Sequence, residues 1–165
     1  VLMFGKNIDY WLLRPLAHSC NRATEKGLNE RFKCASYSLS EAKEYVEKNK
    51  RRFGGHLIVD DKRSYLDIGC GMGRLSFGLI QSGAKDVTAI DIIPRNIEQA
   101  KNIAESLDLE SQPRFMCTDI HEWVTDRKYD VVTVVGVIEH VHKPKLFLQK
   151  LPTLMKSNDL RLFHP

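Results

Sequence analysis

Three glycines at alternate positions follow a short apolar segment, and they indicate a functional site more directly than any other residues in this sequence. Residues 64–68 suit a buried strand, and Gly69, Gly71 and Gly73 come directly after it. A helical pattern begins at Arg74, so the expected unit is a strand, a glycine loop and a helix. Glycine lets the backbone approach a small ligand closely, and the amide groups at the start of a helix attract anionic groups. The pattern therefore predicts a loop that holds a small ligand.

The spacing of the glycines and the acid before them narrow the class of ligand. Residues 67–73 read Asp-x-Gly-x-Gly-x-Gly, whereas the dinucleotide fingerprint is G-x-G-x-x-G. The residue that would complete the dinucleotide form is Arg74 or Ser76. The carboxylate of Asp67 is a poor neighbour for a pyrophosphate, but it tolerates a ligand that carries an ammonium and a sulfonium group. Charge complementarity thus favours S-adenosylmethionine over NAD.

The elements that must position this loop alternate between strand and helix from residue 58 onward. Such repeated units predict an α/β fold with a parallel, doubly wound sheet and right-handed crossovers. The apolar run Val131–Val135 suits a central strand of a parallel sheet. The expected strands are 64–68, 87–90, 114–117, 131–135 and a fifth that begins at 160, and the expected helices are 74–81, 94–107 and 145–155.

Residues 1–57 are predicted to form a helical N-terminal extension, followed by the main domain at 58–165. Ser38 and Glu41 have the spacing of a capping box, Pro15 is expected to kink the helix before it, and Gly54-Gly55 is expected to end the one after it. Residues 1–64 carry 13 Lys and Arg against 8 Asp and Glu. No aromatic residues interleave with this basic surplus, so a solvated helix surface is favoured over a nucleic-acid interface.

The remaining composition describes an ordinary globular chain of 165 residues, 42% of them hydrophobic. No apolar run approaches the roughly 18 residues of a membrane span, so none is expected. The cysteines form no C-x-x-C pair and have no histidine at zinc-finger spacing. Buried, reduced thiols and a cytoplasmic location are therefore predicted. The four cysteines are Cys20, Cys34, Cys70 and Cys117.

Two further acids end predicted strands, at the edge where open α/β sheets bind ligands. Asp91 ends the second strand, where its carboxylate can accept hydrogen bonds from vicinal ribose hydroxyls, or can act as a helix cap or surface group. Asp119 ends the third strand and can accept the adenine amine, with the backbone of Ile120 nearby, or can cap a short helix at 121–123. Cys70 and Ile92 complete this predicted set of cofactor-binding residues.

Taken together, four motifs resemble those of the class I S-adenosylmethionine-dependent methyltransferases. They are the glycine loop, Asp91, Asp119 and the segment 129–133, and the resemblance covers about residues 64–163. It implies a Rossmann-like fold whose glycine loop holds the methionine part of the cofactor. It also implies that Asp91 binds the ribose, that Asp119 binds the adenine and that Val135 lies beside the cofactor.

The segment Val137–Val141 is similar to the motif after strand four of the ubiquinone-pathway O-methyltransferases and their relatives. The resemblance implies that Glu139 and His140 lie by the site of methyl transfer. Some members carry a further glutamate, where this chain has Gly136, and bind a divalent metal; two ligands rarely hold such an ion, so no metal is predicted. His140, with an ordinary pKa of about 6.5, can act as a general base on a hydroxyl or can be a structural histidine.

The function that these observations favour is methyl transfer to a small-molecule acceptor, at oxygen. The alternatives are a catalytically inactive cofactor-binding module that acts in a complex, and an RNA methyltransferase. The resemblance implies seven strands, whereas this sequence begins with Val1 and ends at Pro165, in or just after strand five. A truncated domain is therefore expected, with an exposed sheet edge that promotes self-association.

Overall fold

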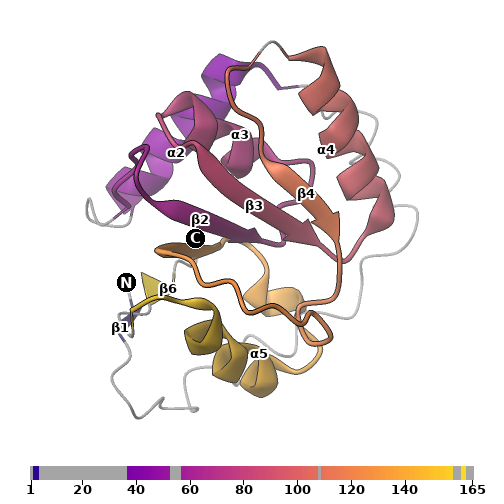
Figure 1. Ribbon diagram of the computed structural model, residues 1–165. Helices are drawn as coiled ribbons and strands as arrows, with labels where there is room; N and C mark the ends of the chain where they lie inside the picture. Colours follow the sequence, from indigo (N-terminus) through magenta and orange to yellow (C-terminus); the bar gives the residue numbers. More distant parts are fainter. Residues whose placement is uncertain (1, 4–36, 53–56, 108, 158–160, 163–165) are drawn as a thin grey trace.

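A computed structural model describes residues 2–3, 37–52, 57–107, 109–157 and 161–162 (Figure 1). At its centre lies a four-stranded parallel sheet with the order β4-β3-β2-β5. The strand of this sheet that comes first in the chain, β2, is therefore an inner strand with β3 on one side and β5 on the other. The strands of this sheet are β2 (Ser64–Ile68), β3 (Asp86–Asp91), β4 (Arg114–Cys117) and β5 (Val131–Val134).

Helices cover both faces of the sheet, which gives the three layers of a doubly wound fold (Figure 1). One face carries α2, α3 and α4, and the other carries α5 and the short 3-10 helix η4 that follows it. The predicted fold class is confirmed. The helices are α2 (Leu39–Arg52), α3 (Arg74–Gln81), α4 (Pro94–Ser106), α5 (Pro144–Lys150), η3 (Ile138–His140) and η4 (Leu151–Leu154).

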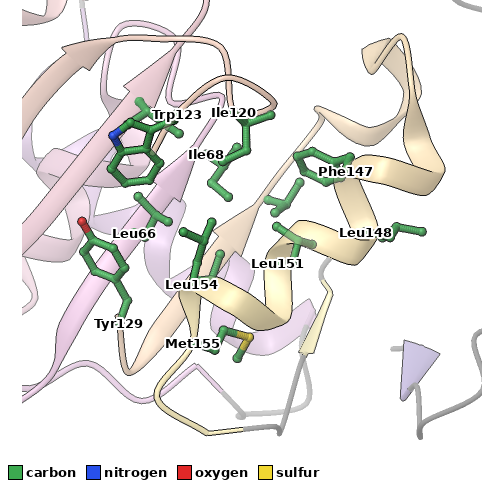
Figure 2. Packing of buried hydrophobic residues seen from close by; sticks show 13 residues of the cluster. Leu66, Ile68, Ile120, Trp123, Tyr129, Phe147, Leu148, Leu151, Leu154 and Met155 are labelled. Atoms are coloured by element: carbon green, nitrogen blue, oxygen red, sulfur yellow. The ribbon is translucent and has the colours of Figure 1, made fainter. Parts of the chain in front are cut away.

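Successive side chains of β2 point to opposite faces of the sheet, as the period of a strand requires. Tyr65 packs against α2 and α3, whereas Leu66 and Ile68 pack against α5 and η4. Figure 2 shows this second cluster, in which Phe147 of α5 faces Ile68 and Ile120. Because burying one large apolar side chain stabilises a fold by about 1.5–3 kcal/mol, both faces of β2 contribute to the stability of the sheet.

The helix α2 crosses α3 at Gly78, at very short range. A Cβ atom at Gly78 would lie 2.2 Å from the carbonyl oxygen of Ala42 and 2.6 Å from Cγ2 of Val46. Only glycine lets the two helices approach this closely. The start of α2 confirms the predicted capping box, since the Ser38 N–H donates to Oε2 of Glu41 (2.6 Å) and the Glu41 N–H donates to Oγ of Ser38 (3.2 Å).

The predicted boundaries of β2, α3 and β4 agree with the structure, but the helix predicted for 145–155 is wrong in its second half. The α-helix ends at Lys150, and Leu151–Leu154 form a 3-10 helix. Pro152 explains the change, because proline lacks the amide hydrogen that an α-helix needs at this point. The strand predicted for 131–135 ends one residue earlier, at Val134.

The last strand was expected to join the central sheet, but it does not. Within the described residues, β6 (Arg161–Leu162) pairs antiparallel with β1 (Leu2–Met3) in a separate two-stranded sheet. The helical extension predicted for 1–57 is therefore wrong at Leu2–Met3, which pair with a strand far along the chain. The predictions for Pro15, Gly54-Gly55, Cys20 and Cys34 concern residues outside the described ranges.

At the amino ends of the strands, Asp130 joins β2 to β5. Its Oδ2 accepts hydrogen bonds from the N–H (2.8 Å) and Oγ (2.7 Å) of Ser64 and from Nζ of Lys156 (2.6 Å). These donors, Lys156 foremost, lower the pKa of Asp130 to about 2. Asp130 thus has a structural role, at the edge of the sheet opposite the glycine loop. No helix of the described part of the chain is long and apolar enough to span a membrane.

Candidate functional site

The predicted site residues converge at the carboxyl edge of the sheet, at its topological switch point. The chain leaves β2 toward β3 and β4, then returns to β5 on the other side of β2. The loops after β2 and β5 therefore diverge here, which is where open α/β sheets bind ligands. The two loops lie against each other, because a Cβ atom at Gly69 would be 2.2 Å from Cγ2 of Val137.

The glycine loop has a backbone that only glycine adopts readily. Gly69, Gly71 and Gly73 have φ angles of 71°, 55° and 86°, all in the left-handed region. The amides of Gly69 and Cys70 both donate to the carbonyl of Ile90 (2.8 and 3.0 Å), which fastens the loop to the end of β3. The loop is therefore a fixed feature of the sheet edge.

The middle glycine differs from its neighbours in what surrounds it. A Cβ atom at Gly71 would meet nothing within 4 Å, whereas one at Gly73 would lie 2.7 Å from the ring of Phe115. Gly69 and Gly73 thus face protein, and Gly71 faces open space. The Gly71 N–H donates to Oδ2 of Asp91 (2.8 Å), so the open part of the loop lies against the carboxylate that ends β3.

Asp91 is a buried carboxylate, with 7% of its surface exposed. Besides the Gly71 amide, it accepts hydrogen bonds at Oδ1 from the N–H of Ile93 (2.8 Å) and from Nδ2 of Asn96 (3.2 Å). The two donors to Oδ1 lie at the start of α4, so Asp91 supports this helix as well as the loop. The structure thus brings Asp91 and the glycine loop together, as predicted.

Beside Asp91, the rim of the site is apolar. Ile92 is 62% exposed and Met116 is 39% exposed, although both are large hydrophobic residues. The Cys117 thiol lies 3.8 Å from the carbonyl of Ile92 and is exposed. The prediction of a buried thiol is therefore wrong for Cys117, because β4 is an edge strand, and it is confirmed for Cys70.

Asp119 begins a turn that follows β4. Its Oδ1 accepts the N–H of His121 (2.8 Å), and its carbonyl accepts the N–H of Trp123 (2.8 Å). The short helix expected at 121–123 is therefore only a turn, with Asp119 as its cap. Nζ of Lys150 donates to the carbonyl of Trp123 (2.5 Å), and Ile120 is buried against α5 (Figure 2).

The two residues predicted to lie by the transfer site, Glu139 and His140, form the 3-10 helix η3 after β5. The N–H of His140 donates to the carbonyl of Val137 (2.8 Å), the residue that touches Gly69. His140 is exposed, Glu139 is half-buried, and Val135 is half-buried against the cluster around Tyr65. Within the described residues no three His, Cys, Asp or Glu side chains gather as a metal-binding group.

Asp67 lies in β2 and is 2% exposed. Its Oδ2 accepts a hydrogen bond from Oγ of Ser76 (2.6 Å), and its Oδ1 accepts one from Oγ1 of Thr133 (3.1 Å). Burial raises the pKa of Asp67 to about 6, although the two hydroxyl groups oppose the shift. Neither Ser76 nor Thr133 was expected to contact Asp67, because the sequence marks each only as a polar residue within an apolar pattern.

Replacing Asp67 by asparagine is expected to change how stability depends on pH. Because its pKa rises from 3.8 to about 6 on folding, the folded chain binds this proton more tightly than the unfolded chain. Asp67 should therefore lower the free energy of unfolding by about 3 kcal/mol as pH rises from about 4 to above 6. Urea titrations across this range should show a smaller fall in the free energy of unfolding for Asp67→Asn than for the parent. An equal dependence on pH in the two proteins would contradict the raised pKa of Asp67.

A further contact comes from outside the predicted site. The hydroxyl of Tyr37 donates to the carbonyl of Met72 (2.6 Å), in the middle of the glycine loop. The two residues are 35 positions apart. No motif in the sequence marks Tyr37, so local pattern analysis missed it.

Comparisons with known proteins identify the family to which the chain belongs. Residues 59–162, more than half of the chain, match the profile of a family described as "Methyltransferase domain". The ubiquinone biosynthesis O-methyltransferase of Rickettsia typhi is 38% identical over 101 residues, which cover 61% of this chain and 40% of that protein. The probable (S)-tetrahydroprotoberberine N-methyltransferase 2 of Papaver bracteatum is 30% identical over 130 residues, covering 78% of this chain and 35% of that protein. The chain thus spans less than half the length of these relatives.

A solved structure has the same arrangement of elements. Coclaurine N-methyltransferase bound to N-methylheliamine and S-adenosylhomocysteine matches with a TM-score of 0.61 and 25% identity. The match covers 78% of this chain and 37% of that chain. The Rossmann-like fold that the motifs implied is confirmed, and so is the resemblance at the level of the family. This chain belongs to the methyltransferase domain family, whose cofactor is S-adenosylmethionine.

Proposed function

We propose that this domain binds S-adenosylmethionine at the carboxyl edge of its sheet and transfers the methyl group to an oxygen atom of a small molecule. The observation that carries the proposal is the contact between Gly71 and Asp91. It places an open stretch of glycine backbone beside a buried carboxylate at the switch point. Such a site suits a ligand with both a hydroxylated ribose and a part that lies close to the backbone.

The methionine part of the cofactor carries a carboxylate, an ammonium and a sulfonium group. The helix α3 begins at Arg74, and the preceding Gly73 provides no side-chain cap, so the amides of its first turn can attract the carboxylate. Ionised Asp67, behind the loop, contributes the negative potential that favours the two cationic groups. Of these two features, Asp67 distinguishes this cofactor from a pyrophosphate, because the start of a helix also attracts phosphate groups.

The nucleoside part of the cofactor fits the side chains that follow β3 and β4. We assign the ribose hydroxyls to Asp91, the face of the adenine to exposed Ile92, and the adenine amine to Asp119 with the backbone of Ile120 nearby. Val135, after β5, closes the site on the opposite side of β2. Asp91 is the strongest of these assignments, because its carboxylate contacts the loop directly.

The acceptor side of the reaction is assigned to the segment after β5. The cofactor supplies an already activated methyl group, so the chain must chiefly position the acceptor and remove a proton from its hydroxyl. His140 is exposed at this edge and can take that proton, with Glu139 as its neighbour. An oxygen acceptor is favoured by the similarity to the O-methyltransferase of Rickettsia typhi, and a nitrogen acceptor by the similarity to the N-methyltransferase of Papaver bracteatum.

Calorimetric titration with S-adenosylhomocysteine tests the cofactor assignment. The chain is expected to bind one equivalent, and a concentration of 100 times the dissociation constant should raise the free energy of unfolding by about 2.7 kcal/mol. A matched titration with NAD should show no binding, because the glycine spacing and Asp67 disfavour a pyrophosphate. Absence of heat and of thermal stabilisation with S-adenosylhomocysteine would refute the proposal.

The role of His140 is tested separately from cofactor binding. His140→Gln should leave the affinity for S-adenosylhomocysteine within about twofold and lower kcat on phenolic acceptors about 100-fold, as expected for loss of a general base. An unchanged kcat would remove His140 from the mechanism. Cytoplasmic location and self-association through the sheet edge remain predictions, to be checked by localisation and by sedimentation.

A further inference from the structure

The hydrogen bond from Tyr37 to Met72 joins the segment before α2 to the centre of the glycine loop. The donor and acceptor lie 2.6 Å apart, and Met72 stands between Gly71 and Gly73. The next amide along the chain, the N–H of Gly73, donates to the carbonyl of Cys70 (2.9 Å). The peptide unit between Met72 and Gly73 is therefore held at both its carbonyl and its amide, directly beside the open face of Gly71.

The ring of Tyr37 belongs to an aromatic group that surrounds Gly73. The ring centroids of Tyr37 and Phe77 are 6.2 Å apart, and those of Phe77 and Phe115 are 5.4 Å apart. Phe77 and Phe115 are the two side chains that a Cβ atom at Gly73 would meet, at 3.0 and 2.7 Å. The segment before α2, the helix α3 and the strand β4 thus all contribute side chains that hold this end of the loop.

The position of Tyr37 is itself set by the docking of α2 on α3. The close approach at Gly78 fixes the distance between the helices, and the guanidinium of Arg74 lies over the ring of Tyr45, 5.0 Å from its centroid. Burial raises the pKa of Tyr37 far above its ordinary value, so its hydroxyl stays a donor throughout the pH range of an assay. The hydrogen bond from Tyr37 to Met72 is therefore available over that whole range of pH.

We propose that Tyr37 is a positioning residue for the cofactor site, and that it acts by fixing the orientation of the Met72–Gly73 peptide unit through its hydroxyl. The proposal rests on the proposed function, since it concerns the same loop. It extends the site to a residue that precedes the family match at residues 59–162. The affinity for the methyl donor is thereby made to depend on how α2 is seated.

The test compares Tyr37→Phe with Tyr45→Phe. The first substitution removes the hydroxyl that contacts the loop and keeps the ring. The second removes a hydroxyl from the helix α2 that follows Tyr37, and this hydroxyl makes no hydrogen bond within the described residues. Calorimetry should show the dissociation constant of S-adenosylhomocysteine rising about tenfold for Tyr37→Phe, as for loss of one part-buried hydrogen bond, and less than about twofold for Tyr45→Phe.

Amide hydrogen exchange of the unliganded chain separates positioning from a general loss of stability. Tyr37→Phe should speed exchange at residues 71–73 and leave α2 and α3 unchanged. Three outcomes would each overturn the positioning role of Tyr37. They are exchange that rises equally across both helices, a variant that does not fold, and a loop that exchanges as in the parent. If the parent does not bind S-adenosylhomocysteine, the proposed function fails, and the role of Tyr37 in holding the loop is then decided by exchange alone.

Discussion

Replacing Asp91 by alanine is expected to weaken the binding of S-adenosylhomocysteine about 100-fold. The carboxylate is the acceptor assigned to the ribose hydroxyls, and each hydrogen bond to a charged group contributes about 1.5–3 kcal/mol. The substitution also leaves the amide of Gly71 without its acceptor, so the loop loses a contact in the same step. Calorimetric titration of the variant measures the change in affinity directly.

The control for this experiment lies on the same strand. Asp86 is at the amino end of β3, where it pairs with Arg114 (2.5 Å) and with Arg127. Asp86→Ala removes one carboxylate from β3 without touching the switch point, so it should leave the affinity within about twofold. An affinity for Asp91→Ala within threefold of the parent would show that the ribose does not bind at this carboxylate.

Replacing Gly78 by valine is expected to lower the free energy of unfolding by about 3 kcal/mol, the range for overpacking a buried contact. The new Cβ atom would lie 2.2 Å from a backbone oxygen of α2, which cannot rotate away as a side chain can. The helix α2 must therefore move away from α3. Because the chain tolerates glycine here despite a helix-propensity cost of about 1 kcal/mol relative to alanine, close packing outweighs propensity at this position.

Urea unfolding measures this effect, with Gln81→Ala as the matched change on the same helix. Gln81 is half-buried at the end of α3, and its substitution should change the free energy of unfolding by less than about 0.5 kcal/mol. Gly78→Val should also weaken cofactor binding, since Tyr37, which holds Met72, lies directly before α2. Equal stabilities of the Gly78→Val variant and the parent would mean that α2 is not seated on α3 in solution.

Local patterns predicted those elements whose signals are local. The alternation of strand and helix placed β2, α3 and β4 with correct boundaries, and the capping box predicted the start of α2. The glycine loop and Asp91 were expected to meet, because the carboxyl ends of parallel strands share one edge of the sheet. The position of a residue at the end of a strand is enough for such a prediction.

Other features depend on contacts between distant parts of the chain, so sequence pattern alone could not show them. The contact of Tyr37 with Met72 spans 35 residues, and the pairing of β1 with β6 joins the two ends of the chain. The exposure of Cys117 depends on which strand lies at the edge of the sheet. Among these features, only the break in the last helix had a local signal, namely Pro152. The apolar pattern of residues 145–155 nevertheless favoured one continuous helix.

The glycine at the crossing of α2 and α3 has a consequence for where this domain begins. The match to the family profile starts at residue 59, after α2, yet α2 buries Ala42 and Val46 completely against α3. A boundary drawn at the start of this profile would therefore remove α2 and expose the apolar face of α3 that packs against it. The unit of folding in this chain therefore begins before α2, and so does the sequence shared with the Papaver bracteatum relative, which covers 78% of the chain.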